Sequence, residues 1–179
     1  MYELSLFSGA GGGLLATKHL LGWKTIGYVE IDDYCQQVLA QRIKDGFLDE
    51  APIFGDINAF LSEGYAERYR GVADVITAGF PCQPFSVAGQ QKGEKDERNL
   101  WPQTRDTIGV VRSRYVLLEN VPGLLSHQYI WTILSELTSM GYDSMWGIVS
   151  AQDAGAQHLR KRWWCVANTS AARAGDRSS

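Results

Sequence analysis

Apolar and polar positions follow two different periods along the chain, and segments of the two kinds alternate. Short apolar runs rich in β-branched and aromatic residues predict buried strands, while apolar residues at helical spacing predict amphipathic helices between them. The expected strands are residues 2–7, 24–31, 51–57, 73–78, 114–121, 142–150 and 162–167. The expected helices are residues 14–21, 34–43, 58–69, 102–111 and 128–140.

This order of elements predicts the fold class. Strands that alternate with helices through short connections are typical of an α/β fold with a doubly wound, mostly parallel sheet. The last two expected strands have no helix between them, so we expect an antiparallel hairpin at the edge of the sheet. Residues 1–168 would form one domain, and the small, polar residues 169–179 would form a flexible tail.

The composition is that of a globular domain, with 179 residues of which 45% are hydrophobic and 21% are charged. A formal net charge of -3 argues against nucleic-acid binding through bulk positive charge, although a local basic patch could still bind nucleic acid. Cys35, Cys82 and Cys165 are far apart, without zinc-site spacing, so we expect a reduced compartment and no metal. With no signal peptide and no bilayer-spanning stretch, we expect a cytoplasmic protein without a membrane partner.

A glycine-rich turn, Phe7-Ser-Gly-Ala-Gly-Gly-Gly13, follows the first expected strand and precedes the first expected helix. Glycines at this place let main-chain N–H groups and the helix amino terminus approach an anionic ligand closely. No Gly-Lys-Ser/Thr follows, so the turn is not a P-loop. By itself the turn fits a nucleotide-type site and a tight strand-to-helix connection equally well.

Acidic residues end the next two expected strands. Glu30 lies about 20 residues beyond the glycines, the spacing at which an acid meets ribose hydroxyls in dinucleotide-type sites. Asp56, at the end of the third strand, offers an acceptor for an adenine amino group. Each acid alone is also explained as a solvated strand end, but the ordered set favours an adenosine ligand.

Cys82 lies in the turn Gly79-Phe-Pro-Cys-Gln-Pro-Phe-Ser86, after the fourth expected strand. Its two prolines fix their own φ and keep the residues before them out of helical geometry, so the thiol sits in a stiff turn. Ligands of α/β folds bind at strand exits, which favours a chemical role. A buried packing cysteine remains the alternative.

Glu119 ends the fifth expected strand, at the same sheet edge as Cys82, so a nucleophile and a carboxyl group could share a pocket. His158, Arg160 and Arg162 alternate along a segment that we expect to be extended, which would place all three on one positive face. Such a face would lower the pKa of a nearby thiol. A hydrated strand-end acid and a solvated basic edge strand are the alternatives.

Together these motifs resemble, in order and over residues 1 to about 168, the cytosine-5 DNA methyltransferases. The resemblance implies the S-adenosylmethionine-dependent doubly wound fold, with S-adenosylmethionine as cofactor and double-stranded DNA as partner. It implies methyl transfer to C5 of a flipped-out cytosine through a covalent adduct of Cys82 at C6. Residues 87–99 resemble the segment that closes over the target base.

The resemblance also assigns roles to individual residues. The catalytic group that it implies is Cys82, Glu119, Arg160 and Arg162. The cofactor-binding group that it implies is Phe7, Gly9, Ala10, Gly11, Gly12, Glu30, Ile31, Asp56, Ile57, Gly79 and Pro81. The substrate-binding group that it implies is Phe80, Gln83, Ser86, Asn120 and His158.

The chain departs from the family pattern in two respects. Family members have Gln at the position of His158 and Pro at that of Gln157, and they continue after the last strand with a target-recognition domain. We therefore expect either a compact form of the enzyme or one that needs a second chain for target recognition. The alternatives are a cofactor- or DNA-binding regulatory subunit without turnover, cytosine-5 methylation of RNA, and, less favoured, a nicotinamide-type oxidoreductase.

Overall fold

A computed structural model describes residues 1–81, 99–126 and 128–169 of the chain. The strands are β1 (Tyr2–Leu6), β2 (Lys24–Val29), β3 (Ile53–Phe54), β4 (Val75–Ala78), β5 (Tyr115–Asn120), β6 (Tyr142–Val149) and β7 (Arg162–Thr169). The helices are α1 (Gly12–Leu21), α2 (Asp33–Lys44), α3 (Ile57–Ser62), the 3-10 helix η1 (Ala66–Tyr69), α4 (Trp101–Val111), α5 (Gly123–Ser126) and α6 (Tyr129–Ser139).

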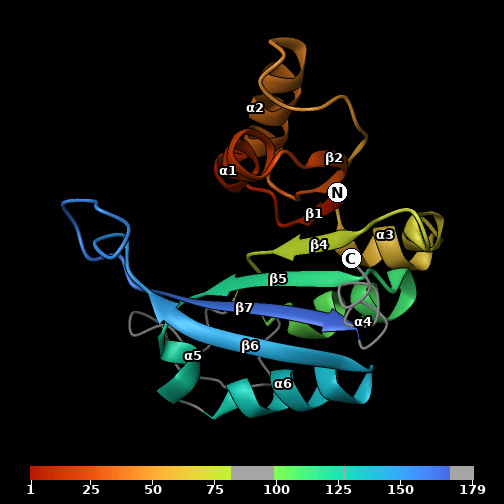
Figure 1. Cartoon of the computed structure of the whole chain (residues 1–179). Helices are drawn as coiled ribbons and strands as arrows, with labels where there is room; N and C mark the ends of the chain where they lie inside the picture. Colours follow the sequence, from red (N-terminus) through yellow and green to blue (C-terminus); the bar gives the residue numbers. More distant parts are fainter. Residues whose placement is uncertain (82–98, 127, 170–179) are drawn as a thin grey trace, which may run out of the picture.

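The strands form one sheet in the order β3-β2-β1-β4-β5-β7-β6. The first five of these strands in the order are parallel, and β7 pairs antiparallel with both β5 and β6 (Figure 1). The doubly wound, mostly parallel sheet and its antiparallel edge hairpin are therefore confirmed. Because the carboxyl ends of β1, β2, β4 and β5 meet at one edge, the residues after them share a site.

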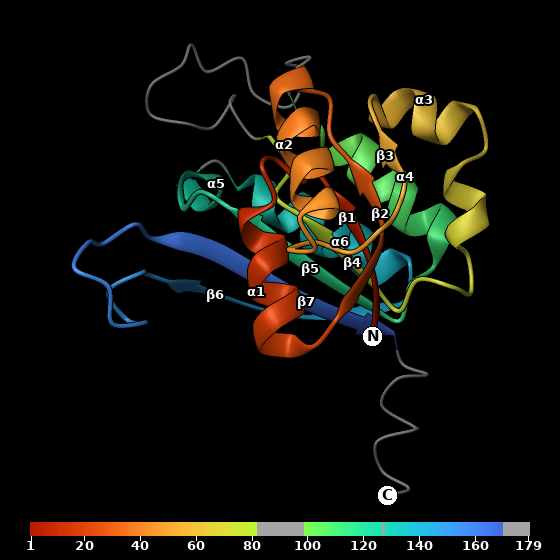
Figure 2. The same ribbon diagram turned by 90° about the horizontal axis from the view of Figure 1, so that it is seen from above.

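Helices cover the two faces of the sheet unequally. Helices α1 and α2 lie on one face beside β1 and β2, and α4, α5 and α6 lie on the other face (Figures 1 and 2). The larger core is on the second face, where buried side chains of β5 and β7 meet those of α4 and α6. A smaller core, made by Leu14, Tyr28, Leu39 and Leu48, joins α1 and α2 to β2.

Cys165 belongs to the larger core and is fully buried. Burial raises the pKa of its thiol to about 11, so this cysteine is a packing residue without nucleophilic character. No helix within the described ranges is long and apolar enough to cross a membrane.

Two expected elements differ from the structure. Residues 58–69 do not form one helix, because Gly64 adopts a φ of +73° and separates α3 from η1. The third strand is two residues long, because Asp56 already caps α3 by accepting the main-chain N–H of Asn58 at 2.9 Å. The strand therefore ends at Phe54, and Asp56 belongs to the cap of α3 instead of to the strand.

Candidate active site at the carboxyl edge of the sheet

The glycine turn after β1 has a backbone that few other residues tolerate. Gly9 has a φ of +54° and Gly11 a φ of +81°, and Phe7 also adopts a positive φ of 54°. A β-carbon at Gly11 would lie 3.1 Å from a methyl carbon of both Leu39 and Leu48. The turn therefore needs glycine for its conformation and for its close packing against α2.

Glu30 contacts this turn directly. Its Oε2 accepts the main-chain N–H of Gly9 at 2.6 Å, and its Oε1 accepts the N–H of Asp32 at 2.9 Å. The side chain is 9% exposed and lies 21 residues after Gly9 in the sequence. The spacing noted in the sequence thus becomes a contact between two strand ends.

The neighbouring strand ends offer further groups beside this contact. Ile31 follows Glu30 and is 69% exposed, which leaves an apolar surface at the edge. The Oδ1 of Asp56 accepts both the N–H and the side-chain amide of Asn58. The side chain of Ile57 is 4% exposed and packs in the core, so only its main chain is accessible to a ligand.

A carboxylate and two arginines line one cavity at the end of β5, beside the exit of β4. Arg162 Nε lies 2.7 Å from Glu119 Oε1, and both side chains are partly shielded from solvent. A β-carbon at Gly79 would lie 3.3 Å from Glu119 Oε2, so the exit of β4 runs directly past this carboxylate. Arg160 lines the same cavity as Gly79, Glu119 and Arg162.

Asn120 fixes the chain that leaves β4. Its buried side-chain amide donates to the carbonyl of Phe80 at 2.9 Å, while its Oδ1 accepts the N–H of Val121 at 2.8 Å. The ring of Phe80 is 2% exposed and lies 5.4 Å from the ring of Trp101. The ring of Phe80 is thus part of the core, and the expectation that Phe80 binds substrate stays a prediction. Pro81 accepts the N–H of Leu100.

The basic segment before β7 differs from the expected extended face. Arg160 has a φ of +34°, so the alternation of an extended chain is broken there, and β7 begins only at Arg162. The two arginines share the cavity, whereas His158 is exposed and is not part of its lining. Cys82, Gln83, Ser86 and the expected closing segment 87–99, apart from its last residue, lie outside the described residues.

The cavity has a volume of about 600 Å³ and extends from the glycine turn to Glu119. Leu20, Leu117 and Trp164 contribute apolar side chains to its lining. Its lining also includes Glu3, a residue that sequence reasoning missed and that is 1% exposed. The signal was present, since Glu3 is a carboxyl group inside a predicted buried strand.

Among the residues that the structure describes, no cation donates a hydrogen bond to Glu3, and threonine hydroxyls hold it instead. It accepts Thr77 at 2.6 Å, Thr17 at 2.7 Å and Thr25 at 3.3 Å. Burial raises the pKa of Glu3 above its ordinary value, and the three hydroxyl donors lower it in part. Among the described residues, no group of three or more His, Cys, Asp or Glu side chains is arranged to hold a metal ion.

Several curated proteins are similar to this chain. The Neisseria gonorrhoeae type II methyltransferase M.NgoMIV is 34% identical over 168 residues, which are 92% of this chain and 51% of that protein. The type II methyltransferase M.CviJI of Paramecium bursaria Chlorella virus IL3A is 33% identical over 167 residues, or 92% of this chain and 42% of that protein. The chain thus spans about half the length of these relatives.

Solved structures and a family model agree with this similarity. A mutant DNMT2 of Spodoptera frugiperda superposes with a TM-score of 0.71 at 21% identity, covering 94% of this chain and 50% of that one, which shows the shared fold. The family model for C-5 cytosine-specific DNA methylase matches residues 1–174. With its glycine turn, its strand-end acids and its Glu119–Arg162 pair in place, the chain belongs to the C-5 cytosine-specific DNA methylase family.

Proposed function

We propose that this chain transfers a methyl group from S-adenosylmethionine to C5 of cytosine in double-stranded DNA. The observation that carries the proposal is the Glu119–Arg162 pair beside Gly79, at the point where the chain leaves β4 toward Cys82. The same sheet edge holds the glycine turn and Glu30. Membership of the family and the type II methyltransferase relatives support this function.

The residues at the edge fit S-adenosylmethionine. The turn around Gly9 and Gly11 leads into the amino terminus of α1, where free N–H groups suit the anionic end of an amino acid. Glu30 offers carboxylate oxygens to ribose hydroxyls, and exposed Ile31 offers an apolar surface to adenine. Bound there, the cofactor supplies an electrophilic methyl group.

The protein's part of the chemistry is to make C5 of cytosine nucleophilic. The thiolate of Cys82 adds to C6, and the electron pair of the C5–C6 double bond becomes available at C5, stabilised toward N3. Glu119 shares a proton with N3, which becomes more basic as the adduct forms, and Arg162 orients that carboxyl group. After methylation, loss of the C5 proton and departure of Cys82 restore the ring and the thiolate.

The DNA must present its cytosine outside the base stack, because the ring atoms are not accessible within a duplex. The chain carries a net charge of -3, so phosphate contacts depend on local basic residues such as Arg160 and Lys161. The family resemblance assigns the choice of target sequence to a separate domain, and we propose that a further domain or a second chain supplies it. Mixing the protein with candidate partner chains before the assay tests this assignment.

Trapping the covalent intermediate tests the proposed function. DNA that contains 5-fluorocytosine should form a stable adduct with the parent protein in the presence of S-adenosylmethionine. Fluorine replaces the C5 proton whose removal normally allows Cys82 to leave C6, so the adduct cannot break down. Cys82→Ser should form no adduct, and Glu119→Gln should form it much more slowly. A parent protein that binds S-adenosylmethionine yet gives no adduct and no methyl transfer with DNA, while it methylates tRNA, would overturn the DNA assignment.

A further inference from the structure

We infer that Arg42 of α2 is a positioning residue for the glycine turn and thereby for the affinity of S-adenosylmethionine; the second half of this inference rests on the proposed function. Arg42 Nη1 donates a hydrogen bond to the carbonyl oxygen of Ala10 at 2.5 Å, across 32 residues of sequence. Ala10 lies between Gly9 and Gly11, both of which have left-handed backbone conformations.

The glycine turn has few hydrogen bonds of its own to hold its shape. Within it, the N–H of Gly11 donates to the carbonyl of Ser8 at 3.0 Å, and Gly9 donates to Glu30. Glycine gives the chain the required conformation but also leaves it more alternatives than any other residue does. A hydrogen bond from a charged group outside the turn therefore restricts the orientation of the Ala10 peptide.

Two further contacts show that α2 supports the site as a unit. Leu39, three residues before Arg42, closes the space behind Gly11 together with Leu48. Gln36, three residues before Leu39, donates its side-chain amide to the carbonyl of Glu30 at 2.8 Å. Residues three apart are neighbours on a helix surface, so this part of α2 holds both the glycine turn and the strand end that carries the acid.

Lys44 provides a matched control on the same helix. Arg42 and Lys44 both lie in the last turn of α2, where a positive charge interacts favourably with the helix dipole. Lys44 is exposed. Removing either charge changes the dipole interaction in the same way, and only Arg42→Met also removes the hydrogen bond to Ala10.

The experiment compares the 179-residue chain with its Arg42→Met, Arg42→Lys and Lys44→Met variants. Hydrogen exchange of the peptide that covers the glycine turn is measured without ligand, and S-adenosylmethionine binding is measured by calorimetry. We expect Arg42→Met to speed exchange and to weaken binding by about tenfold, the loss typical of a hydrogen bond from a charged donor. Arg42→Lys should recover part of both, Lys44→Met should match the parent, and kcat at saturating cofactor should stay within about twofold of the parent in every variant.

The two readouts separate this inference from the proposed function. If the parent binds no S-adenosylmethionine, the proposed function fails, and turn exchange in Arg42→Met still decides whether Arg42 holds the turn. Exchange and affinity equal to those of Lys44→Met would overturn the inference. If Arg42→Met does not fold, Arg42→Lys decides: unchanged exchange and affinity contradict the inference, and a partial loss of both supports it.

Discussion

At the scale of single residues, the least expected group is the carboxyl of Glu3. It is buried beneath the cavity and is bound by hydroxyl groups from α1, β2 and β4. Hydroxyl donors stabilise a carboxylate less than a cation does, so burial dominates and the pKa of Glu3 is raised above 4.5. The folded protein therefore binds this proton more tightly than the unfolded chain does.

This raised pKa predicts how stability depends on pH. As pH rises above about 4.5, the unfolded chain loses the proton first, so Glu3 makes the parent progressively less stable until pH exceeds the folded pKa. Glu3→Gln has no such titration. The free energy of unfolding of the parent minus that of Glu3→Gln should therefore fall across this window and stay constant on either side of it. Urea unfolding at a series of pH values measures this difference.

Thr77→Val provides the control for Glu3. It removes the hydroxyl that makes the shortest hydrogen bond to Glu3 and keeps the shape of the side chain. It should cost about 1 kcal/mol of stability at neutral pH and extend the pH window upward. A difference between parent and Glu3→Gln that is flat with pH, or that rises across the window, would contradict the raised pKa of Glu3.

Also at the residue scale, the Glu119–Arg162 pair makes a prediction about catalysis. Arg162→Met should lower methyl transfer by about a hundredfold or more, because the carboxyl group loses the guanidinium that orients it in the transition state. Arg162→Lys should recover little, since an ammonium is a point charge without the planar donor geometry of arginine. Single-turnover methylation with saturating cofactor measures both variants.

S-adenosylmethionine affinity is the control for Arg162, because the glycine turn and Glu30 do not depend on it. The dissociation constant of Arg162→Met should stay close to that of the parent. Equal losses in cofactor affinity and in methyl transfer would show that Arg162 acts on the cofactor site instead of on Glu119.

At the scale of elements, the turn between β1 and α1 is where the sequence and the backbone agree most closely. Gly11→Ala should cost about 2 kcal/mol or more, because alanine is strained at a φ of +81° and its β-carbon would press on Leu39 and Leu48. Gly13→Ala, in the helical first turn of α1 with no atom within 4 Å of the added carbon, should leave stability unchanged or slightly improve it. Thermal unfolding compares the two, and equal effects would contradict this account.

The seven strands and the helices α1, α2, α4 and α6 followed from the alternation of apolar runs and helical spacing, because each of them is amphipathic or buried along its own length. The short helix α5 was not expected. The break at Gly64 was not predicted, since a glycine within a helical pattern is often tolerated and only its positive φ ends α3. Likewise, the extended face through His158 failed at Arg160, whose positive φ has no signature in the residue type.

Parts of the site could be predicted for a different reason. Glu30 and Glu119 end parallel strands, so topology alone brings them to one edge with the glycine turn. Glu3 and its three threonines come from four separate segments, and Arg42 reaches Ala10 from the last turn of a helix. Such contacts depend on the register of whole elements, which a motif does not encode.

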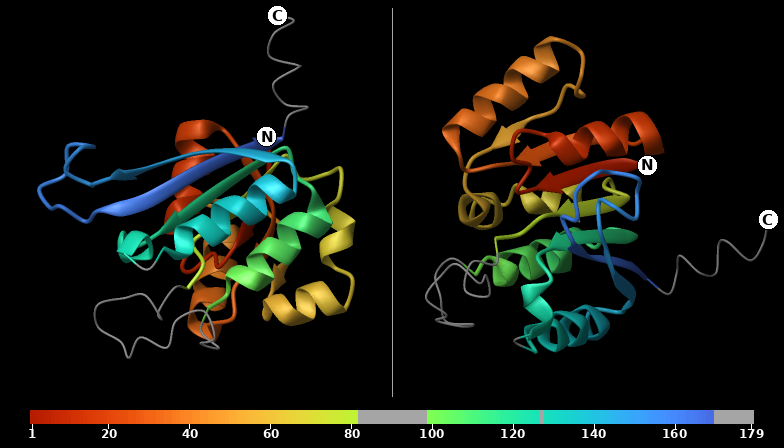
Figure 3. Two further views of the ribbon diagram at one scale, coloured as in Figure 1. Left: turned by 90° about the horizontal axis from the view of Figure 1, so that it is seen from below. Right: turned by 90° about the vertical axis from the view of Figure 1, so that its left-hand side faces the viewer.

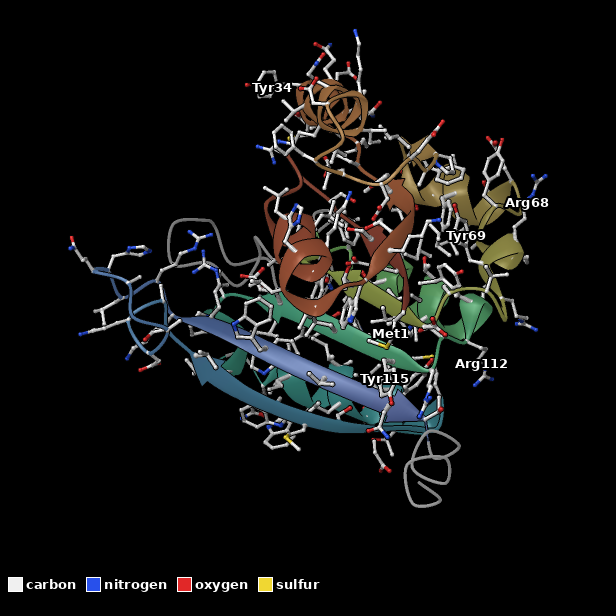
Figure 4. All side chains as sticks on the ribbon, turned by 45° about the horizontal axis from the view of Figure 1, so that its top comes forward. Met1, Tyr34, Arg68, Tyr69, Arg112 and Tyr115 are labelled. Atoms are coloured by element: carbon white, nitrogen blue, oxygen red, sulfur yellow. The ribbon has the colours of Figure 1, made fainter. Side chains whose placement is uncertain are left out.

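At the scale of the whole molecule, the two faces of the sheet differ in how far they are covered by helices. The face that meets α4 and α6 is buried, whereas the same strands are partly exposed on the side of α1 (Figure 3). The side chain of Tyr34 of α2 also stays at the surface, whereas that of Tyr115 of β5 is half-buried (Figure 4). Apolar surface is thus unevenly distributed over the domain.

Met145 and Val166 form part of the exposed apolar surface on β6 and β7. They are directly paired across β6 and β7, so their side chains lie on the same face, and they are 80% and 49% exposed. Contiguous exposed apolar surface of this kind binds hydrophobic probes. The double variant Met145→Thr and Val166→Thr should therefore bind less of an apolar fluorescent dye, with the unfolding free energy changed by no more than about 0.5 kcal/mol.

A matched substitution on the opposite face completes this prediction. Val116→Thr places the same hydroxyl group in β5 against the buried core, where the side chain is 0% exposed. It should cost about 1–3 kcal/mol, because a buried hydroxyl without a partner keeps its full desolvation penalty. The stability loss should be larger for Val116→Thr than for the surface pair only if one face of the sheet is buried and the other is exposed. Dye binding unchanged by the surface pair, or equal stability losses on both faces, would show that this face of β6 and β7 is covered in solution.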